Sequence, residues 1–340
     1  MQHTPAEFRE WINPDPGQIG ESVTEFLSIL ERPTWITIDG IDNTRSRTIV
    51  TLLHANEPSG LKAVHRILRA GLIPATRLGI FVASVNAALE PPLLSHRYLP
   101  GEEDFNRCFN PPYETDQRRL AAALLTKLHA FQPEAVIDTH NTSGHSAAFA
   151  VAIRDDEETV NLAGRFTDKL IIIDQALGTL IEQREGHCPI VTVEFGGYTD
   201  PNADRLAYET LREFISAPEL TSRTGQQVKI LKHSLRLELQ EGHQVHYGST
   251  VRDQTSVTIF NTIDQLNFET LEAGSPIGWP AEDGLGGLMV KSATGEDLTE
   301  TYLAIRDGFI VTNHRIIIFM ATTDSVVAEQ DCLLYLTPLH

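Results

Sequence analysis

Hydrophobic and polar positions follow two different patterns along this chain. Between about residues 34 and 215, short apolar runs alternate with amphipathic stretches. The apolar runs predict strands at 34–39, 47–54, 78–85, 135–140, 147–153, 170–174 and 189–195. The amphipathic stretches predict helices at 59–70, 116–131, 157–168 and 201–216. This alternation is typical of a largely parallel sheet that is covered by helices on both faces.

From about residue 220 onward, helical patterns become rare. Segments with period-two alternation dominate, such as "QVKILKHSLRLEL" (227–239) and "DGFIVTNHRIIIFMAT" (307–322), with glycine and proline turns between them. We therefore expect an α/β domain at 1–219 and a smaller, mainly-β domain at 220–340.

Composition excludes several classes of protein. The formal net charge of -19 and the lack of a basic face argue against a nucleic-acid partner. No apolar run reaches 18 residues, so no transmembrane helix is expected. The N-terminus lacks the basic and apolar regions of a signal peptide, which makes the cytoplasm the expected location. The 3 cysteines form no CxxC pair, which favours a reduced compartment and excludes a four-cysteine zinc site.

The segment "TLLHANEPSG" (51–60) places a histidine and a carboxylate directly after an apolar run. His54 is expected at the carboxyl end of a strand, where open α/β sheets bind their ligands. Glu57 follows in the turn, close enough to bind the same ion. The chain has 13 histidines, so this spacing alone also fits a loop histidine beside a glutamate at the start of a helix.

A second histidine, His140, ends the strand-like segment "AVIDTH" (135–140). Two imidazoles and one carboxylate would form a three-ligand zinc site with a fourth position open for water. Asp138 could orient a ligand histidine by accepting its other ring N–H. Taken alone, His140 also fits a hydrogen-bonded loop histidine.

Glu194 lies within "PIVTVEFGGY" (189–198), a run rich in β-branched residues that predicts a central strand. Carboxylates are rarely buried in such strands without a partner or a function. Beside a metal site, Glu194 could take a proton from water and pass it to a leaving amine. An ion-paired structural glutamate is the alternative.

The segment 86–115 is long and irregular, and such loops within compact domains are usually functional. It contains Arg97 and Arg107. An arginine can bind a carboxylate through two hydrogen bonds and can stabilise an oxyanion. Arginines are also common on protein surfaces, so the loop alone assigns them no role.

Four segments occur in a fixed order: "HANEPSG", "RYL" with "DFNRCF", "DTHNTSG" and "TVEFGG". Together they resemble the succinylglutamate desuccinylase/aspartoacylase family of zinc carboxypeptidase-like amidohydrolases, over about residues 45–215. The resemblance implies a zinc carboxypeptidase-like fold for 1–219, with a mixed, mostly parallel sheet flanked by helices. It also implies a small C-terminal β domain, which agrees with the pattern at 220–340.

The resemblance carries roles onto individual positions. His54, Glu57 and His140 match the family's ligands for one zinc ion per chain. Glu194 matches its catalytic glutamate, and Arg97 matches the arginine that polarises the scissile carbonyl.

Other positions match substrate-binding residues or depart from the family pattern. Asn106 and Arg107 match the pair that binds a substrate carboxylate. Arg184 is similar to a further carboxylate-binding arginine, although the residues between it and the fourth motif align poorly. The first motif has Leu52 and Ala55 where glycine is frequent in the family, so its loop is expected to differ in shape.

The activity implied by the resemblance is zinc-dependent hydrolysis of the amide bond in a small N-acyl amino acid or a related carboxylate-bearing substrate. Such an enzyme acts on carbon–nitrogen bonds other than peptide bonds. A zinc carboxypeptidase acting on peptides and a non-catalytic metal- or ligand-binding protein on the same scaffold are the alternatives, and the intact Glu194 argues against the second. A nicotinamide-cofactor enzyme is disfavoured because no GxGxxG follows the first strands. The motifs leave open the acyl group, the amine and the oligomeric state, including a homo-oligomer.

Overall fold

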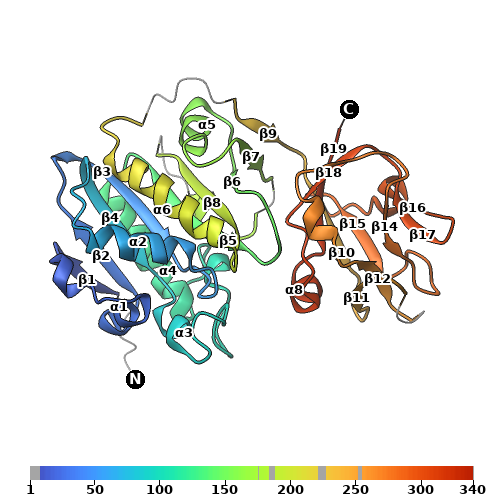
Figure 1. The fold of residues 1–340 in the computed structure, drawn as a ribbon, viewed down its shortest axis with the longest axis horizontal. Coiled ribbons are helices and arrows are strands. Elements are labelled where there is room, and N and C mark those ends of the chain that lie inside the picture. Colours follow the sequence, from blue (N-terminus) through green and yellow to red (C-terminus); the bar gives the residue numbers. More distant parts are fainter. Residues whose placement is uncertain (1–7, 175, 184–187, 221–226, 252–254, 340) are drawn as a thin grey trace. The chain divides into compact units, whose positions relative to one another are not determined.

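The computed structural model describes residues 8–174, 176–183, 188–220, 227–251 and 255–339 (Figure 1). The chain forms two compact units. The N-terminal unit comprises Met1–Asn141, Ala148–Ile171 and Ala176–Ile230, and the C-terminal unit comprises Thr142–Ala147, Ile172–Gln175 and Leu231–His340.

The N-terminal unit is built on a nine-stranded mixed sheet with the strand order β1-β2-β4-β3-β5-β8-β6-β7-β9. Strands β4, β3 and β5 are parallel to one another, whereas β2 runs antiparallel to β4 and β6 antiparallel to β8. All residues of β5 and β8 are buried, as expected for strands in the middle of a sheet. The sheet consists of β1 (Arg9–Ile12), β2 (Thr34–Ile38), β3 (Asp42–Thr51), β4 (Thr76–Val82), β5 (Val136–Thr142), β6 (Phe149–Ala152), β7 (Lys169–Ile172), β8 (Ile190–Gly197) and β9 (Lys229–Leu231).

The helices of this unit are α1 (Val23–Leu30), α2 (Ser59–Arg69), α3 (Val85–Leu89), α4 (Asp116–Phe131), α5 (Glu157–Ala163) and α6 (Pro201–Ser216). Figure 1 shows α2 and α6 packed side by side over the sheet. The side chains of Thr115 and Asp200 cap α4 and α6, and a proline begins α6. The predictions for 116–131 and 201–216 are confirmed at both ends, and these signals explain where the two helices begin.

Some local predictions differ from the structure. The elements β1, α1 and α3 were not predicted, and α5 ends at Ala163 rather than at residue 168. Strand β3 ends at Thr51, three residues before His54. It ends there because Leu52 adopts a left-handed backbone conformation with φ 57°, which no strand can accommodate. His54 therefore lies in a loop and not on the strand itself.

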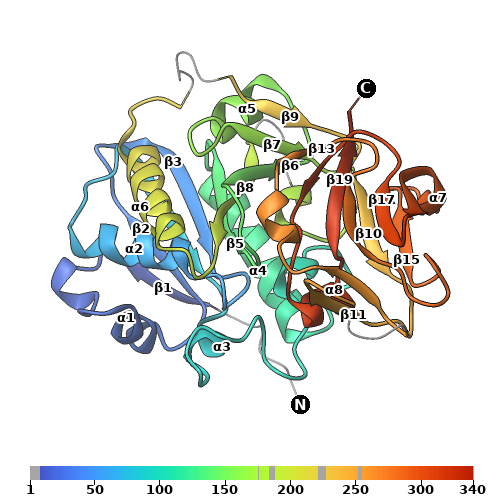
Figure 2. The same ribbon diagram turned by 45° about the vertical axis from the view of Figure 1, so that its right-hand side comes forward.

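The C-terminal unit is drawn mostly in orange and red in Figure 2. It contains two five-stranded sheets, in the orders β13-β18-β19-β10-β15 and β11-β12-β14-β17-β16. Most strand pairs are antiparallel, and one shared core buries side chains such as Leu237, Val290 and Ile310. The mixed sheet and these antiparallel sheets confirm the predicted fold class. The elements are β10 (Leu235–Leu239), β11 (Val245–Gly248), β12 (Val257–Phe260), β13 (Thr270–Leu271), β14 (Pro276–Trp279), β15 (Leu288–Lys291), α7 (Thr299–Tyr302), β16 (Leu303–Arg306), β17 (Phe309–Thr312), β18 (Ile316–Phe319), α8 (Ser325–Gln330) and β19 (Leu334–Pro338).

Among the described residues, no helix combines the length and the apolar character that crossing a membrane requires.

Candidate metal centre

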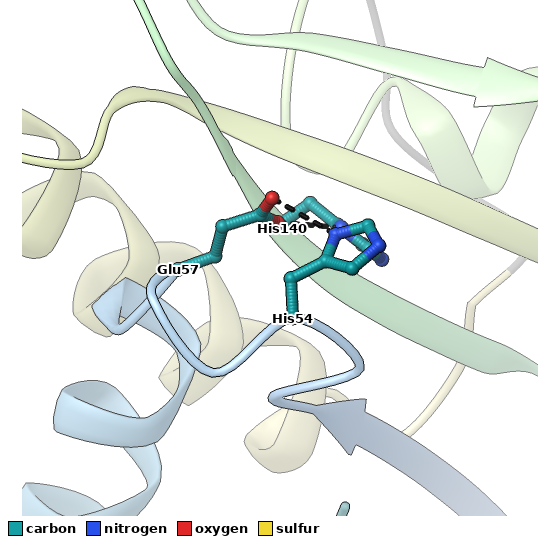
Figure 3. A group of neighbouring side chains, drawn as sticks. All are labelled: His54, Glu57 and His140. Atoms are coloured by element: carbon teal, nitrogen blue, oxygen red, sulfur yellow. Dashed lines mark hydrogen bonds and ion pairs between the residues drawn. The ribbon is translucent and has the colours of Figure 1, made fainter. Parts of the chain in front are cut away.

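His54, Glu57 and His140 come together at one edge of the nine-stranded sheet (Figure 3). His54 and Glu57 lie in the loop between β3 and α2, and His140 lies in β5. Because β3 and β5 are parallel neighbours, their carboxyl ends share this edge. The order of strands therefore brings together two segments that are more than eighty residues apart.

The three side chains form a buried group with one ligand atom each, and these atoms all lie within 4.8 Å of one another. Nδ1 of His54 is 2.9 Å from Oε1 of Glu57, and Nδ1 of His140 is 2.6 Å from Oε2. In the part of the chain that the structure describes, this is the one group of three histidine, cysteine or acidic side chains with such spacing. Both imidazoles thus turn the same ring nitrogen toward the shared carboxylate.

A carboxylate holds the other nitrogen of each ring. Nε2 of His54 lies 2.9 Å from Oδ1 of Asp104, and Nε2 of His140 lies 2.9 Å from Oδ2 of Asp138. A carboxylate accepts a hydrogen bond from a ring N–H, so an imidazole that binds a metal through Nδ1 would carry its hydrogen on Nε2, where these carboxylates lie. Asp138 is fixed in turn by a hydrogen bond from the hydroxyl of Thr192.

The structure places Asp138 beside His140, a candidate ligand, and adds Asp104 beside His54, which sequence reasoning missed. Asp104 precedes the residues "FNR" in the segment "DFNR", so its place in the motif was visible. What the sequence did not show was that the loop folds back onto His54. Nothing in the pattern of the loop itself predicts this fold.

The charges at this site shift several pKa values. Burial raises the pKa of Glu57, but His54 and His140 outweigh it and hold that pKa below its usual range. Burial likewise raises the pKa of Asp104, and His54 and Arg97 bring it below the usual range. Burial lowers the pKa of His140, but Asp138 and Glu57 raise it well above its ordinary value. Glu57 and Asp104 are therefore carboxylates at neutral pH.

This donor set fits zinc. Zinc sites in enzymes combine imidazole nitrogens with a carboxylate oxygen, and each ligand histidine usually donates its second N–H to a carboxylate or carbonyl. Both conditions are met by the side chains present. Three ligands also leave room for a fourth, which is the arrangement of catalytic rather than structural zinc sites.

Glu194 lies in β8, the neighbour of β5. Thr192 contacts Asp138, and because side chains alternate along a strand, Glu194 lies on the same face as His140. Its side chain is buried, and Oε2 has no hydrogen-bond partner among the described residues. Burial raises the pKa of Glu194 to about 8, with His140 and Arg97 opposing the rise and Glu57 and Asp138 adding to it.

Arg97 lies beside the metal-ligand group. Its guanidinium donates hydrogen bonds to two carboxylates. Nη1 is 3.3 Å from Oε1 of Glu57, and Nε and Nη2 are 3.2 and 3.0 Å from Oδ2 of Asp104. One carboxylate, that of Asp104, thus contacts both Arg97 and the ligand His54.

Asn106 and Arg107 follow Asp104 in a short 3-10 helix. The backbone N–H of Asn106 donates to Asp104, and its side-chain oxygen accepts from the backbone of Leu180 at 3.1 Å. Nη1 of Arg107 donates to the Asn106 carbonyl at 2.9 Å. Arg184, the further candidate from the sequence, lies outside the described residues.

No protein-family model and no curated protein matches this sequence. Solved structures do match. They include a succinylglutamate desuccinylase from Vibrio cholerae, at 14% identity and a TM-score of 0.58, covering 94% of this chain and 96% of that chain. The product-bound ectoine utilization protein EutE (DoeB) from Ruegeria pomeroyi matches at 14% identity and a TM-score of 0.57, covering 89% of this chain and 88% of that one.

A succinylglutamate desuccinylase/aspartoacylase from Rhodobacter sphaeroides matches at 13% identity and a TM-score of 0.55, again covering 89% of this chain and 88% of that chain. The chain therefore has the fold of these desuccinylase and aspartoacylase structures, as the motif resemblance predicted. At such low identity, the likeness concerns the fold, and the chemistry has to be argued from the site.

Proposed function

We propose that this protein is a zinc-dependent hydrolase that cleaves the amide bond of a small N-acyl amino acid or a related carboxylate-bearing substrate. The observation that carries the proposal is the orientation of two buried imidazoles. Nδ1 of His54 and of His140 faces Glu57, and Nε2 of each is held by a carboxylate. Such preorganisation is typical of a metal centre rather than of an ordinary buried ion pair.

When bound, zinc acts as a Lewis acid toward a carbonyl oxygen and makes water more acidic. In our proposal, Glu194 takes a proton from the attacking water and returns it to the leaving amine. Its burial, its lack of a partner for Oε2 among the described residues and its pKa of about 8 support this role. A carboxyl with a pKa near neutrality can both accept and donate a proton at physiological pH.

Arg97 is proposed to polarise the scissile carbonyl. Its guanidinium lies next to the metal ligand Glu57, so it can reach an oxygen that develops negative charge at the metal centre. Two hydrogen bonds, from Nε and Nη2 to the same oxygen of Asp104, orient the guanidinium before substrate arrives.

Asn106 and Arg107 are proposed to bind a substrate carboxylate, with Arg184 as a further candidate. Support comes from their position two and three residues after Asp104, whose Oδ1 contacts His54, so that this segment lies near the proposed metal centre. A carboxylate-bearing substrate also agrees with the similar structures, which are named as desuccinylases and aspartoacylases.

The proposal is tested first by metal analysis and then by a substrate panel. We expect about one zinc per chain after reconstitution, and close to none in His54→Ala and His140→Ala. The panel compares N-acetyl and N-succinyl derivatives of acidic and basic amino acids with unblocked di- and tripeptides. The control is Arg205→Ala on α6, which removes an exposed ion pair with Glu209 and leaves the proposed metal ligands in place.

Turnover of N-acyl amino acids that disappears on chelation and returns with zinc supports the proposal. Preferential turnover of the peptides identifies a zinc carboxypeptidase instead. Stoichiometric zinc without hydrolysis of any member of the panel identifies a metal-binding protein. A failure to bind zinc at all overturns the assignment of His54, Glu57 and His140.

A further inference from the structure

Asn141 is the residue that follows the ligand His140, and its side chain is buried between three elements. Its Oδ1 accepts the backbone N–H of Ser59 at 3.0 Å. Its Nδ2 donates to the hydroxyl of Ser59 at 2.9 Å and to the carbonyl of Gly196 at 3.0 Å. A buried amide that makes three hydrogen bonds is held in one orientation.

The partners of Asn141 belong to the segments that carry the site. Ser59 is the first residue of α2 and comes two residues after Glu57. Gly196 comes two residues after Glu194 in β8. The backbone N–H of Asn141 also donates to Oε2 of Glu57 at 3.2 Å. One residue therefore bonds to the loop of the first motif and to the strand of the proposed base.

The contact with α2 is itself fixed. The hydroxyl of Ser59 donates to Asp204 in α6 at 2.7 Å, and Asp204 pairs with Lys62 one turn further along α2. Asn141 thus joins β8 to α2, which packs against α6.

The contact with β8 occurs where the strand geometry is least regular. Gly196 has φ 112°, a conformation that few residues other than glycine adopt. Its carbonyl direction is therefore set by its environment more than by the regular pleat of the strand. Nδ2 of Asn141 donates to this carbonyl, two residues from Glu194.

We propose that Asn141 is a positioning residue that holds the Glu194 segment of β8 at a fixed place relative to His54, Glu57 and His140. The proposal rests on the proposed role of Glu194 as general base. Asn141 acts through the Gly196 carbonyl and touches neither substrate nor metal. Its effect should therefore appear in turnover and in the local order of β8 more than in metal binding.

The test compares Asn141→Ala with Ser59→Ala. The first variant removes the bond to Gly196, whereas the second removes the Ser59 hydroxyl and leaves that bond in place. We expect kcat to fall about 100-fold in Asn141→Ala, as for a misplacement of about 1 Å, with KM changed by less than about threefold. Both variants should bind about one zinc per chain, because the backbone N–H to Glu57 remains.

A second readout does not depend on activity. Hydrogen–deuterium exchange of the zinc-loaded proteins should show at least about tenfold faster exchange around residues 193–199 in Asn141→Ala, and wild-type rates there in Ser59→Ala. If Asn141→Ala does not fold, Asn141→Asp takes its place, since it keeps the volume and loses the donors to Gly196.

Equal kcat and equal exchange in wild type and Asn141→Ala overturn the proposal. So does a loss of zinc that accounts for the whole loss of activity, because Asn141 would then only support the metal ligands. If the wild type hydrolyses nothing in the substrate panel, the proposed function fails. In that case, faster exchange confined to β8 in Asn141→Ala still supports the link between Asn141 and the Glu194 strand.

Discussion

Oδ1 of Asp104 lies 2.9 Å from Nε2 of His54, although the two residues come from different loops. The other oxygen of the same carboxylate accepts from Arg97. Asp104 therefore contacts a proposed metal ligand and an arginine beside it at the same time. This link makes the long loop between α3 and α4 part of the metal centre.

Replacing Asp104 by Asn should weaken zinc binding. Asparagine has nearly the same shape but no charge, so His54 loses the charged partner that holds its ring in place. We expect zinc affinity to fall about 10- to 100-fold, measured by competition with a chelator. Glu103→Gln is the matched control, since it removes the same charge one residue away, from a side chain that contacts Thr115 and Arg118. Equal affinities in the two variants would contradict the role of Asp104.

Glu194→Gln should abolish turnover and leave zinc in place. The amide has the size of the carboxyl but cannot accept a proton, and Glu194 is not among the three grouped ligands. We expect kcat to fall about 10²- to 10⁴-fold, with zinc content and circular dichroism unchanged. A variant that retains near wild-type kcat would show that another group acts as the base.

Zinc affinity should increase with pH. Because Asp138 and Glu57 raise the pKa of His140, that imidazole carries a proton in the metal-free protein at neutral pH, and zinc must displace it. Below the raised pKa of His140, each decrease of one pH unit should therefore lower the apparent zinc affinity by about tenfold for every proton that zinc binding releases. Titration calorimetry in buffers of different ionisation enthalpy measures the number of protons released when zinc binds. An affinity that does not change between pH 6 and pH 7 would contradict the expectation.

At position 52, a glycine variant should be more stable than an alanine variant, which is the reverse of the usual order. The Leu52 side chain is fully buried, and its φ of 57° is unfavourable for any residue with a Cβ. Leu52→Ala and Leu52→Gly both lose the buried side chain, but only glycine relieves the backbone strain. We expect the glycine variant to be about 1 kcal/mol more stable than the alanine variant in denaturant unfolding. The ordinary order, with alanine more stable, would show that the loop relaxes when the side chain is lost.

Leu52 also shows where sequence-based prediction reached its limit. Strong periodicity and clear caps predicted the helices at 116–131 and 201–216, because local interactions alone decide those boundaries. A leucine in a left-handed conformation has no local signal, so strand β3 was predicted to continue to His54. The tertiary context of the loop overrides the residue's own preference.

The residues of the candidate site likewise include some that the sequence predicted and others that it did not. Residue types and spacing in the sequence predict His54, Glu57 and His140 as a metal-binding group, and the parallel strands bring them together. The contacts of Asp104 and Asn141 depend on how a loop folds back and on how a strand and a helix approach each other. Such relationships join residues far apart in the chain, and no period or motif encodes them.

Gly60→Ala should disturb both stability and zinc binding. A Cβ at this position would lie 2.0 Å from Oγ1 and 2.6 Å from Cβ of Thr139, so α2 would have to move away from β5. We expect a loss of about 1–3 kcal/mol in the free energy of unfolding, as for other overpacked sites. Because α2 begins directly after Glu57 and Pro58, its displacement should also weaken zinc binding. Gly17→Ala is the control, since nothing lies within 4 Å of its added Cβ, and its stability should change by less than about 0.5 kcal/mol. Wild-type stability and zinc affinity in Gly60→Ala would show that the close approach of α2 to β5 is not needed to hold Glu57 in place.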